Sequence, residues 1–145
     1  MTMEKKVKKT EEEVQFKGKF TQAIGRRKTA VAQIRLYKNG SGAILVNSLK
    51  MTQYFPKNLI GFIHQALKLT GHSRDLNFSI KVMGGGKKPQ AGAVLLGIAR
   101  ALVMLDKELQ PVIKAKNWLT RDSRKKERKK PGLKKARKAP QWAKR

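Results

Sequence analysis

The densest group of side chains able to bind a charged partner lies at the C-terminal end of the sequence. Residues 121–145 contain thirteen lysines and arginines, opposed only by Asp122 and Glu127. Like charges at this density repel one another, and Leu133 and Trp142 are the only large apolar side chains, so the segment cannot form its own core. Ordering it costs roughly 1–2 kcal/mol per residue in backbone entropy. A nucleic acid, with a phosphate on every nucleotide, is the partner best able to offset that cost.

A second cationic cluster consists of Arg26, Arg27 and Lys28, between two segments with the composition of strands. A turn between strands can point such side chains outward, and a guanidinium group can bind two phosphate oxygens with its planar fork. The alternative is a solvated turn without a partner. Because the whole chain is strongly basic, we favour contact with nucleic acid.

A third candidate site is the sequence Gly84-Gly85-Gly86 followed by Lys87 and Lys88. The glycines precede a predicted helix, whose free amide groups and positive dipole end attract anions. The spacing fits neither a Walker loop nor a dinucleotide-binding fingerprint. Glycines here could also serve a tight turn and close packing of the helix against a sheet, and the two roles are compatible.

No residue pattern predicts catalysis. The sequence has no paired carboxylates, no catalytic triad, no metal-ligand spacing and no cysteine. His64 and His72 are each isolated from any cluster of carboxylates. We therefore predict no catalytic residue, no metal, no cofactor and no small-molecule substrate.

The aromatic side chains divide into two groups. Tyr54, Phe55 and Trp118 could stack on bases, but aromatic side chains at the ends of elements more often lie at the edge of a core. Trp142 differs because it lies in a tail that has no core to join. We predict that Trp142 stacks on a base or on a neighbouring protein.

The charge is distributed over the whole chain. Of a formal net charge of +26 over 145 residues, residues 114–145 carry fifteen basic and two acidic side chains, which is +13. The other half lies on the rest of the chain, so the body is also expected to touch a polyanion. No uninterrupted apolar run reaches the length of a membrane span, and the N-terminus lacks the apolar core of a signal peptide. We therefore predict a cytoplasmic protein without membrane contact.

Alternation of apolar and polar residues predicts the strands of the body. Strands are expected at residues 19–24, 30–37 and 76–83. Gly25 is expected to close the first strand. Asn39-Gly40 is expected to form a hairpin turn leading to a return strand at residues 43–46, because both residue types tolerate positive φ.

Helical spacing begins after Pro56 and ends at a predicted C-cap, Gly71. Further helices are expected at residues 89–105 and 107–114. This order predicts an α+β fold of two layers, with helices on one face of a mixed sheet. The predicted organisation is a disordered extension (residues 1–17), a globular body (residues 18–113) and an extended basic tail (residues 114–145).

Several motifs together resemble one family. They are residues 25–32 (GRRKTAVA), 84–86 (GGG), 97–102 (GIARAL), 119–122 (LTRD) and 127–137 (ERKKPGLKKAR), with a final Lys144-Arg145. The combination resembles the small ribosomal subunit protein nine family, in its bacterial or organellar branch, over residues 18–145. The departures are Pro89 where glycine is expected, Leu95 where arginine is usual, Trp142 in place of phenylalanine and Ala143 in place of serine.

The resemblance implies a structural protein in the head of the small ribosomal subunit, without enzymatic activity. It implies a fold of the ribosomal-protein-five second-domain type, with a left-handed βαβ crossover. The implied partners are the 3′ major domain of 16S rRNA, neighbouring head proteins, and the anticodon stem-loop of P-site tRNA, which the tip of the tail approaches.

The candidate site residues follow from the clusters and the resemblance together. The predicted tRNA-binding residues are Lys144 and Arg145. The predicted rRNA-binding residues are Arg26, Arg27, Lys28, Lys87, Lys88, Arg121, Arg124, Lys125, Lys126, Arg128, Lys129, Lys130, Lys134, Lys135, Arg137 and Lys138. Two alternatives stay open from the residues alone, a DNA-compacting protein with a basic tail and an enzyme on the same fold class. Pro131-Gly132 and Trp142 at fixed places favour a tail built for one path over generic compaction.

Overall fold

The computed structural model describes residue 16 and residues 18–144. The predicted N-terminal extension therefore lies almost entirely outside the described residues, as does Arg145. The elements in order are β1 (Phe20–Arg27), β2 (Ala30–Tyr37), β3 (Ile44–Val46), β4 (Leu49–Lys50), α2 (Met51–Tyr54), α3 (Lys57–Leu69), β5 (Asn77–Met83), α4 (Lys87–Leu105), the 3₁₀ helix η1 (Lys107–Leu109) and α5 (Gln110–Ala115).

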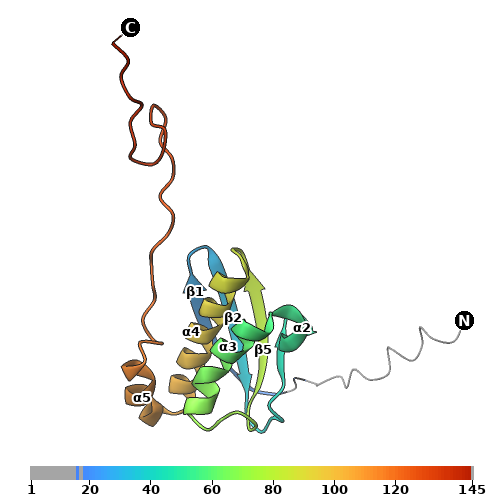
Figure 1. Ribbon diagram of the computed structural model, residues 1–145. Coiled ribbons are helices and arrows are strands. Elements are labelled where there is room, and N and C mark those ends of the chain that lie inside the picture. Colours follow the sequence, from blue (N-terminus) through green and yellow to red (C-terminus); the bar gives the residue numbers. More distant parts are fainter. Residues whose placement is uncertain (1–15, 17, 145) are drawn as a thin grey trace, which may run out of the picture.

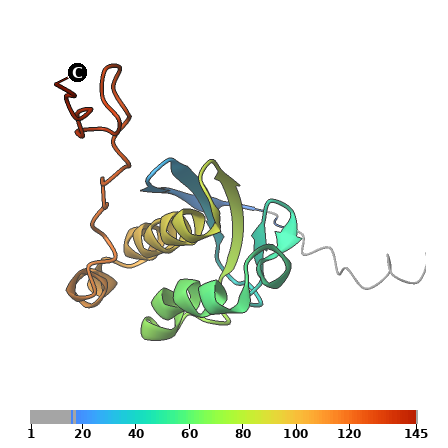
Figure 2. The ribbon, with the colours of Figure 1, turned by 45° about the horizontal axis from the view of Figure 1, so that its top comes forward.

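The strands form one mixed sheet in the order β1-β2-β5-β3-β4. All neighbouring strands are antiparallel except β3 and β5, which are parallel and are joined through β4, α2 and α3. Figures 1 and 2 show helices α3 and α4 on the same side of the sheet. The predicted α+β class, with helices over one face of a mixed sheet, is confirmed.

Side-chain alternation builds the core between the sheet and these helices. In β5 the side chains of Phe78, Ile80 and Val82 are buried, and the residues between them are more exposed. Helix α3 buries Ile63 and Leu67 on its apolar face. The period-two and helical patterns thus predicted these elements correctly, because each pattern requires only that one face be covered.

Helix α4 is the central element of the core. It begins two residues earlier than predicted, so Pro89 lies in its first turn, and eleven of its nineteen residues are buried. Its length and composition would suffice to cross a membrane, contrary to the expectation from the sequence. However, 61% of its most apolar 18-residue stretch is buried inside this fold. Its apolar character is accounted for by the core.

The predicted hairpin after β2 is wrong. Strand β3 does not return beside β2 but lies parallel to β5 on its other side. The amide of Gly40 donates to the carbonyl of Asp75 at 2.8 Å, and the amide of Ala43 donates to the side-chain oxygen of Asn77 at 2.8 Å. These bonds carry the chain across the start of β5.

The sheet contains a two-residue hairpin that the sequence did not predict, the β3–β4 turn. Asn47 and Ser48 both have positive φ, 48° and 67°. Positive φ at both central residues is the requirement of a type I′ turn, which matches the twist of paired strands. The Asn47 side chain also exchanges two hydrogen bonds with the backbone of Val82 in β5, at 2.8 and 3.1 Å. This turn is therefore fastened to β5 as well as joining β3 to β4.

The prediction for Gly25 is also wrong. Strand β1 does not close there but continues to Arg27. A Cβ atom on Gly25 would lie 1.8 Å from the carbonyl oxygen of Ala93, and one on Gly97 would lie 2.5 Å from Ile34. These two glycines let α4 lie directly on the sheet, so Gly25 serves close packing rather than a turn.

The packed body extends beyond residue 113. Trp118 and Leu119 are partly buried against the core, after helix α5 has ended. From residue 120 to residue 144 the chain contains turns and bends but no helix or strand. Figure 1 shows this segment leaving the body beside α5 and running far from it.

Candidate nucleic-acid interface

The end of β1 sends the two arginines of the cationic cluster to opposite faces of the sheet. Because successive side chains of a strand alternate, exposed Arg26 lies on the face away from the helices, and Arg27 lies on the helix side. The aliphatic part of Arg27 lies on α4 at Gly92, where a Cβ atom would come within 2.7 Å of it. Lys28 occupies the turn with a φ of 51°. The sequence predicted that all three side chains point outward from one loop, whereas the structure places Arg26 and Arg27 on opposite faces of the sheet.

Asp122 joins the start of the tail to this turn. Its carboxylate lies 3.1 Å from the Arg27 guanidinium, and it accepts hydrogen bonds from the Arg124 side chain and from the Arg124 backbone amide at 3.0 Å. The Arg124 bonds, with the charges of Arg124 and Arg27, hold the pKa of the Asp122 carboxyl well below its usual range. Asp122 is therefore ionised at neutral pH and links the start of the tail to the β1–β2 turn.

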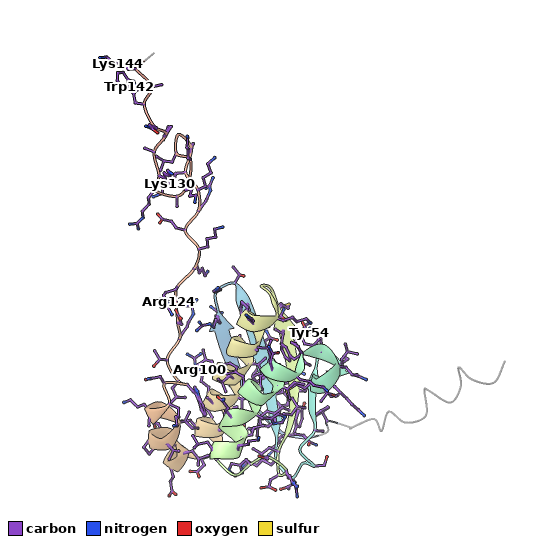
Figure 3. All side chains as sticks on the ribbon, in the orientation of Figure 1. Tyr54, Arg100, Arg124, Lys130, Trp142 and Lys144 are labelled. Atoms are coloured by element: carbon purple, nitrogen blue, oxygen red, sulfur yellow. The ribbon has the colours of Figure 1, made fainter. Side chains whose placement is uncertain are left out.

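One consequence is a hollow that gathers cations from two distant segments. It is lined by the turn residues Arg27 and Lys28 and by the tail residues Asp122, Arg124, Lys125 and Lys126, with a volume of about 380 Å³. We call it the basic hollow. Figure 3 shows Arg124 where the tail passes the body. The structure thus brings together five of the predicted rRNA-binding residues.

The triple glycine has a clear packing role. Gly84 and Gly85 adopt positive φ of 71° and 64°, and a Cβ atom on Gly84 would lie 2.6 Å from the carbonyl oxygen of Thr29. The buried amide of Gln90 donates to the Gly84 carbonyl at 3.1 Å and accepts from the Tyr54 hydroxyl at 3.0 Å. Gly86 caps α4 without a side-chain hydrogen bond, so the anion-binding role of this helix start remains compatible with the packing role.

Lys87 and Lys88 point to different neighbours. The Lys87 ammonium lies 3.3 Å from the centre of the Tyr54 ring and 5.9 Å from that of Phe55, a cation–π arrangement. Lys88 is exposed and shares a second hollow with Arg27 and Lys28. Phe55 is buried and Tyr54 half-buried, which confirms the prediction that this aromatic pair lies at the core edge.

The tail is not extended throughout. Glu127 accepts hydrogen bonds from Lys130 at 3.2 Å and from Arg137 at 2.9 Å, which closes a loop. Gly132, with a φ of 80°, lies within the loop, and the Lys134 amide donates to the Lys138 carbonyl at 2.7 Å. The sequence predicted an extended tail, and within it the structure has a closed loop over residues 127–138. Each of the tail's two acidic residues contacts two cations, a role that the sequence analysis missed.

The remaining predicted tail residues are solvent-facing. All ten are exposed to solvent: Arg121, Lys125, Lys126, Arg128, Lys129, Lys130, Lys134, Lys135, Arg137 and Lys138. Trp142 is 83% exposed, and Figure 3 shows it with Lys144 at the far end of the tail. Both side chains are positioned to meet a partner and not the body of the protein.

Arg100 is a positioning residue that the sequence analysis did not single out for binding. Its guanidinium group donates a hydrogen bond to the Ile24 carbonyl at 2.8 Å, which ties α4 to the edge strand β1.

Within residues 16 and 18–144, no three His, Cys, Asp or Glu side chains converge in a group able to hold a metal ion. Partial burial and the nearby charge of Lys68 lower the pKa of His64, so this histidine is neutral at pH 7.

A mixed α+β domain that carries a cationic turn, a basic hollow and a long cationic arm belongs to the class of small basic proteins built to bind polyanions. The comparisons identify the family within this class. The chain belongs to the ribosomal protein S9/S16 family, whose pattern matches residues 25–145.

Two relatives show the extent of the similarity. The chain is 45% identical over 124 residues to the small ribosomal subunit protein uS9 of Azobacteroides pseudotrichonymphae genomovar. CFP2, covering 85% of this chain and 96% of the relative. It is 50% identical over 127 residues to uS9 of Solidesulfovibrio magneticus (strain ATCC 700980 / DSM 13731 / RS-1), covering 87% and 97%. The resemblance identified from the motifs is thus confirmed, and the chain is a ribosomal protein of the small subunit, of bacterial type, located in the ribosome in the cytoplasm.

Proposed function

We propose that this protein is a structural constituent of the small-subunit head that binds the 3′ major domain of 16S rRNA. The observation that carries the proposal is the basic hollow, because it joins cations of the β1–β2 turn to cations of the tail through Asp122. Neutralisation of phosphates by such ordered cations lets rRNA strands approach one another. Membership of a ribosomal family supports this role and indicates no catalytic activity.

We also propose the finer assignment of the fold and its organisation. The body is of the ribosomal-protein-five second-domain type, with a left-handed crossover between β3 and β5. The support is that β3 and β5 are parallel neighbours joined through helices α2 and α3. The body holds the tail, and neighbouring head proteins are its further partners.

The proposal is tested by replacing Arg26, Arg27 and Lys28 together with glutamine. Thermal stability should change little, because a partly exposed surface ion pair such as Arg27–Asp122 contributes little to folding. Filter binding to a 16S rRNA head fragment over a series of salt concentrations should show weaker affinity. The slope of log affinity against log salt should fall by roughly two, at about 0.7–0.9 per phosphate contact.

The matched control replaces three exposed lysines outside the cluster, Lys50, Lys57 and Lys68, with glutamine. This variant loses the same formal charge, but its three lysines lie outside the basic hollow, so its salt slope should stay near that of the wild type. Equal losses in both variants would mean that net charge alone drives binding. Loss of folding in the first variant would mean that the cluster is structural.

A second part of the proposal concerns the tip of the tail. We propose that Lys144 and Arg145 bind the anticodon stem-loop of P-site tRNA, and that Trp142 stacks on a base or a protein neighbour there. The support is the placement of Trp142 and Lys144 at the far end of an arm that leaves the body. Cations beyond Trp142 add little to packing of rRNA around residues 121–138, where the basic run is already dense.

Deletion of Lys144 and Arg145 should leave subunit assembly intact and weaken P-site tRNA binding by about 1–3 kcal/mol, the range for one or two charge-assisted hydrogen bonds. The measurement is filter binding of tRNA to purified subunits that carry the truncated protein at normal occupancy. As a control, Lys134→Gln with Lys135→Gln removes two tail cations but keeps the tip, and should leave tRNA affinity unchanged. Unchanged affinity at low magnesium in the truncated subunits would show that the tip does not touch tRNA.

A further inference from the structure

A second hollow lies beside the basic hollow and has a different character. Its volume is about 490 Å³, within the roughly 300–1,000 Å³ that is usual for sites of small ligands. Phe62 of α3, Leu95 and Leu96 of α4, and Trp118 after α5 are among its lining residues. We call it the apolar hollow. It lies where the start of the tail, two helices and the β1–β2 turn meet.

An aromatic ring lies open to solvent in this hollow. Phe62 is 38% exposed, although its neighbour on the chain, Ile63, is completely buried. Leaving such a ring in water forgoes the stabilisation that burial would give it. Trp118 is half-buried, so the hollow offers two aromatic side chains as well as an aliphatic floor. A partner with a flat apolar surface would cover them.

The lining of the apolar hollow also includes three cations and, within the described residues, no acidic side chain. Arg27, Lys28 and Lys88 are these cations. Arg27 and Lys28 line the basic hollow too, so the two hollows share one wall. A ligand that fills both must therefore join a flat apolar group to a chain of negative charges.

A nucleotide within a single strand has this combination. Its base is a flat ring with a π face, and each base is joined to a phosphate on either side. Proteins that read single-stranded or bulged RNA take unstacked bases onto aromatic side chains and hold the backbone with cations. A double helix cannot present a base in this way, because its bases are stacked and paired.

We propose that the apolar hollow is a binding site for one unstacked rRNA base, placed against Phe62 and Trp118. The flanking phosphates contact Arg27, Lys28 and Lys88, and the strand continues through the basic hollow toward Lys125. This inference rests on the proposed rRNA-binding function and adds a base-binding site to it. The cations bind the phosphates of the RNA backbone, and the aromatic rings bind the base.

The test uses the full-length protein with Trp142→Phe, which leaves Trp118 as the single tryptophan of the chain. The probe is a five-nucleotide single-stranded RNA of four uridines with a central adenosine, compared with the same strand abasic at the centre. Both strands carry the same phosphates. The adenosine strand should quench Trp118 fluorescence saturably and bind at least about fivefold more tightly, the lower limit for one base–aromatic stack. The salt slopes of the two strands should be equal.

Variants at Phe62 show whether this ring carries the preference. Phe62→Ala and Phe62→Leu should both remove the difference between the two strands, and Phe62→Leu keeps most of the apolar volume if alanine impairs folding. The matched control is Leu69→Ala, on the same helix and 40% exposed against 38% for Phe62, but outside the hollow. The control should keep the preference in full.

The outcomes separate this inference from the proposed function. Equal binding of the two strands without quenching of Trp118 would overturn the base site and leave electrostatic rRNA binding intact. Failure of both strands to bind, together with loss of binding to the rRNA head fragment, would overturn the proposed function as well. Quenching by an acidic, aromatic peptide but not by the adenosine strand would assign the hollow to a protein partner and overturn the proposal.

Discussion

Replacing Gly25 with alanine should lower the free energy of unfolding by about 3 kcal/mol or more, at the upper end of the range for overpacking a well-packed core. The new methyl group would lie 1.8 Å from the Ala93 carbonyl oxygen and 2.6 Å from the Gly97 amide nitrogen. Both are backbone atoms of α4, so no side chain can rotate away to make room. Either α4 moves off β1 or β1 bends at this point. Urea unfolding followed by circular dichroism measures the loss.

Gly61→Ala is the matched control. Gly61 is an exposed position in α3, and no heavy atom lies within 4 Å of the Cβ that alanine would add. Alanine there should stabilise the protein by about 0.5–1 kcal/mol, because glycine inside a helix loses more backbone entropy on folding. Equal stability of Gly25→Ala and the wild type would mean that α4 can shift without loss, and that the close contact does not hold the layers together.

The elements that the sequence predicted well are those whose signal is local. The alternation in β2 and β5 and the helical spacing in α3 state which face is buried, and the structure buries that face. The hairpin predicted at Asn39-Gly40 was wrong. The residue types suit a turn, but distant residues determine which strand β3 pairs with. Asn39 does adopt a positive φ of 57°, yet hydrogen bonds to Asp75 and Asn77, over thirty positions away, send the chain past β5.

Gly25 shows the same limit for a glycine. A glycine at the end of a predicted strand predicts a turn when only the neighbouring residues are considered. Its reason here is the carbonyl of Ala93, which approaches it from a helix almost seventy residues later. Nothing in the spacing around Gly25 carries that information. The misplaced end of β1 then led to the expectation that Arg26 and Arg27 point the same way.

The candidate site was predictable as composition but not as geometry. Runs of lysine and arginine indicated a polyanion partner, and the family comparison confirms a ribosomal protein. The pairing of Asp122 with Arg27 joins residues 95 positions apart, and two isolated carboxylates gave no signal for it. The sequence likewise did not predict Phe62 as a binding residue, because an apolar residue on an apolar helix face is expected to be part of the core until its exposure is known.

The second large effect is expected from removal of residues 121–145. The deletion takes away thirteen lysines and arginines and two acidic residues, while the residues packed against the core end with Leu119. Stability of the body should therefore change little. If six of these cations contact phosphates, affinity for the rRNA head fragment should fall by at least about 10³-fold near 0.1 M salt, and the salt slope should drop by about four to five. Filter binding over a salt series measures both quantities.

A second variant distinguishes the effect of the tail's charge from the effect of the course that the tail follows. Shuffling residues 121–143 within a full-length chain keeps every charge but removes the Asp122–Arg27 pair and the Glu127–Arg137 closure. Its salt slope on naked rRNA should match the wild type, because counterion release depends on the number of phosphates neutralised and not on their order. Its incorporation into small subunits should be reduced, because the tail must leave the body in one direction and form one loop to follow rRNA. Normal incorporation of the shuffled protein would mean that the tail acts by charge alone, the behaviour expected of a compacting protein.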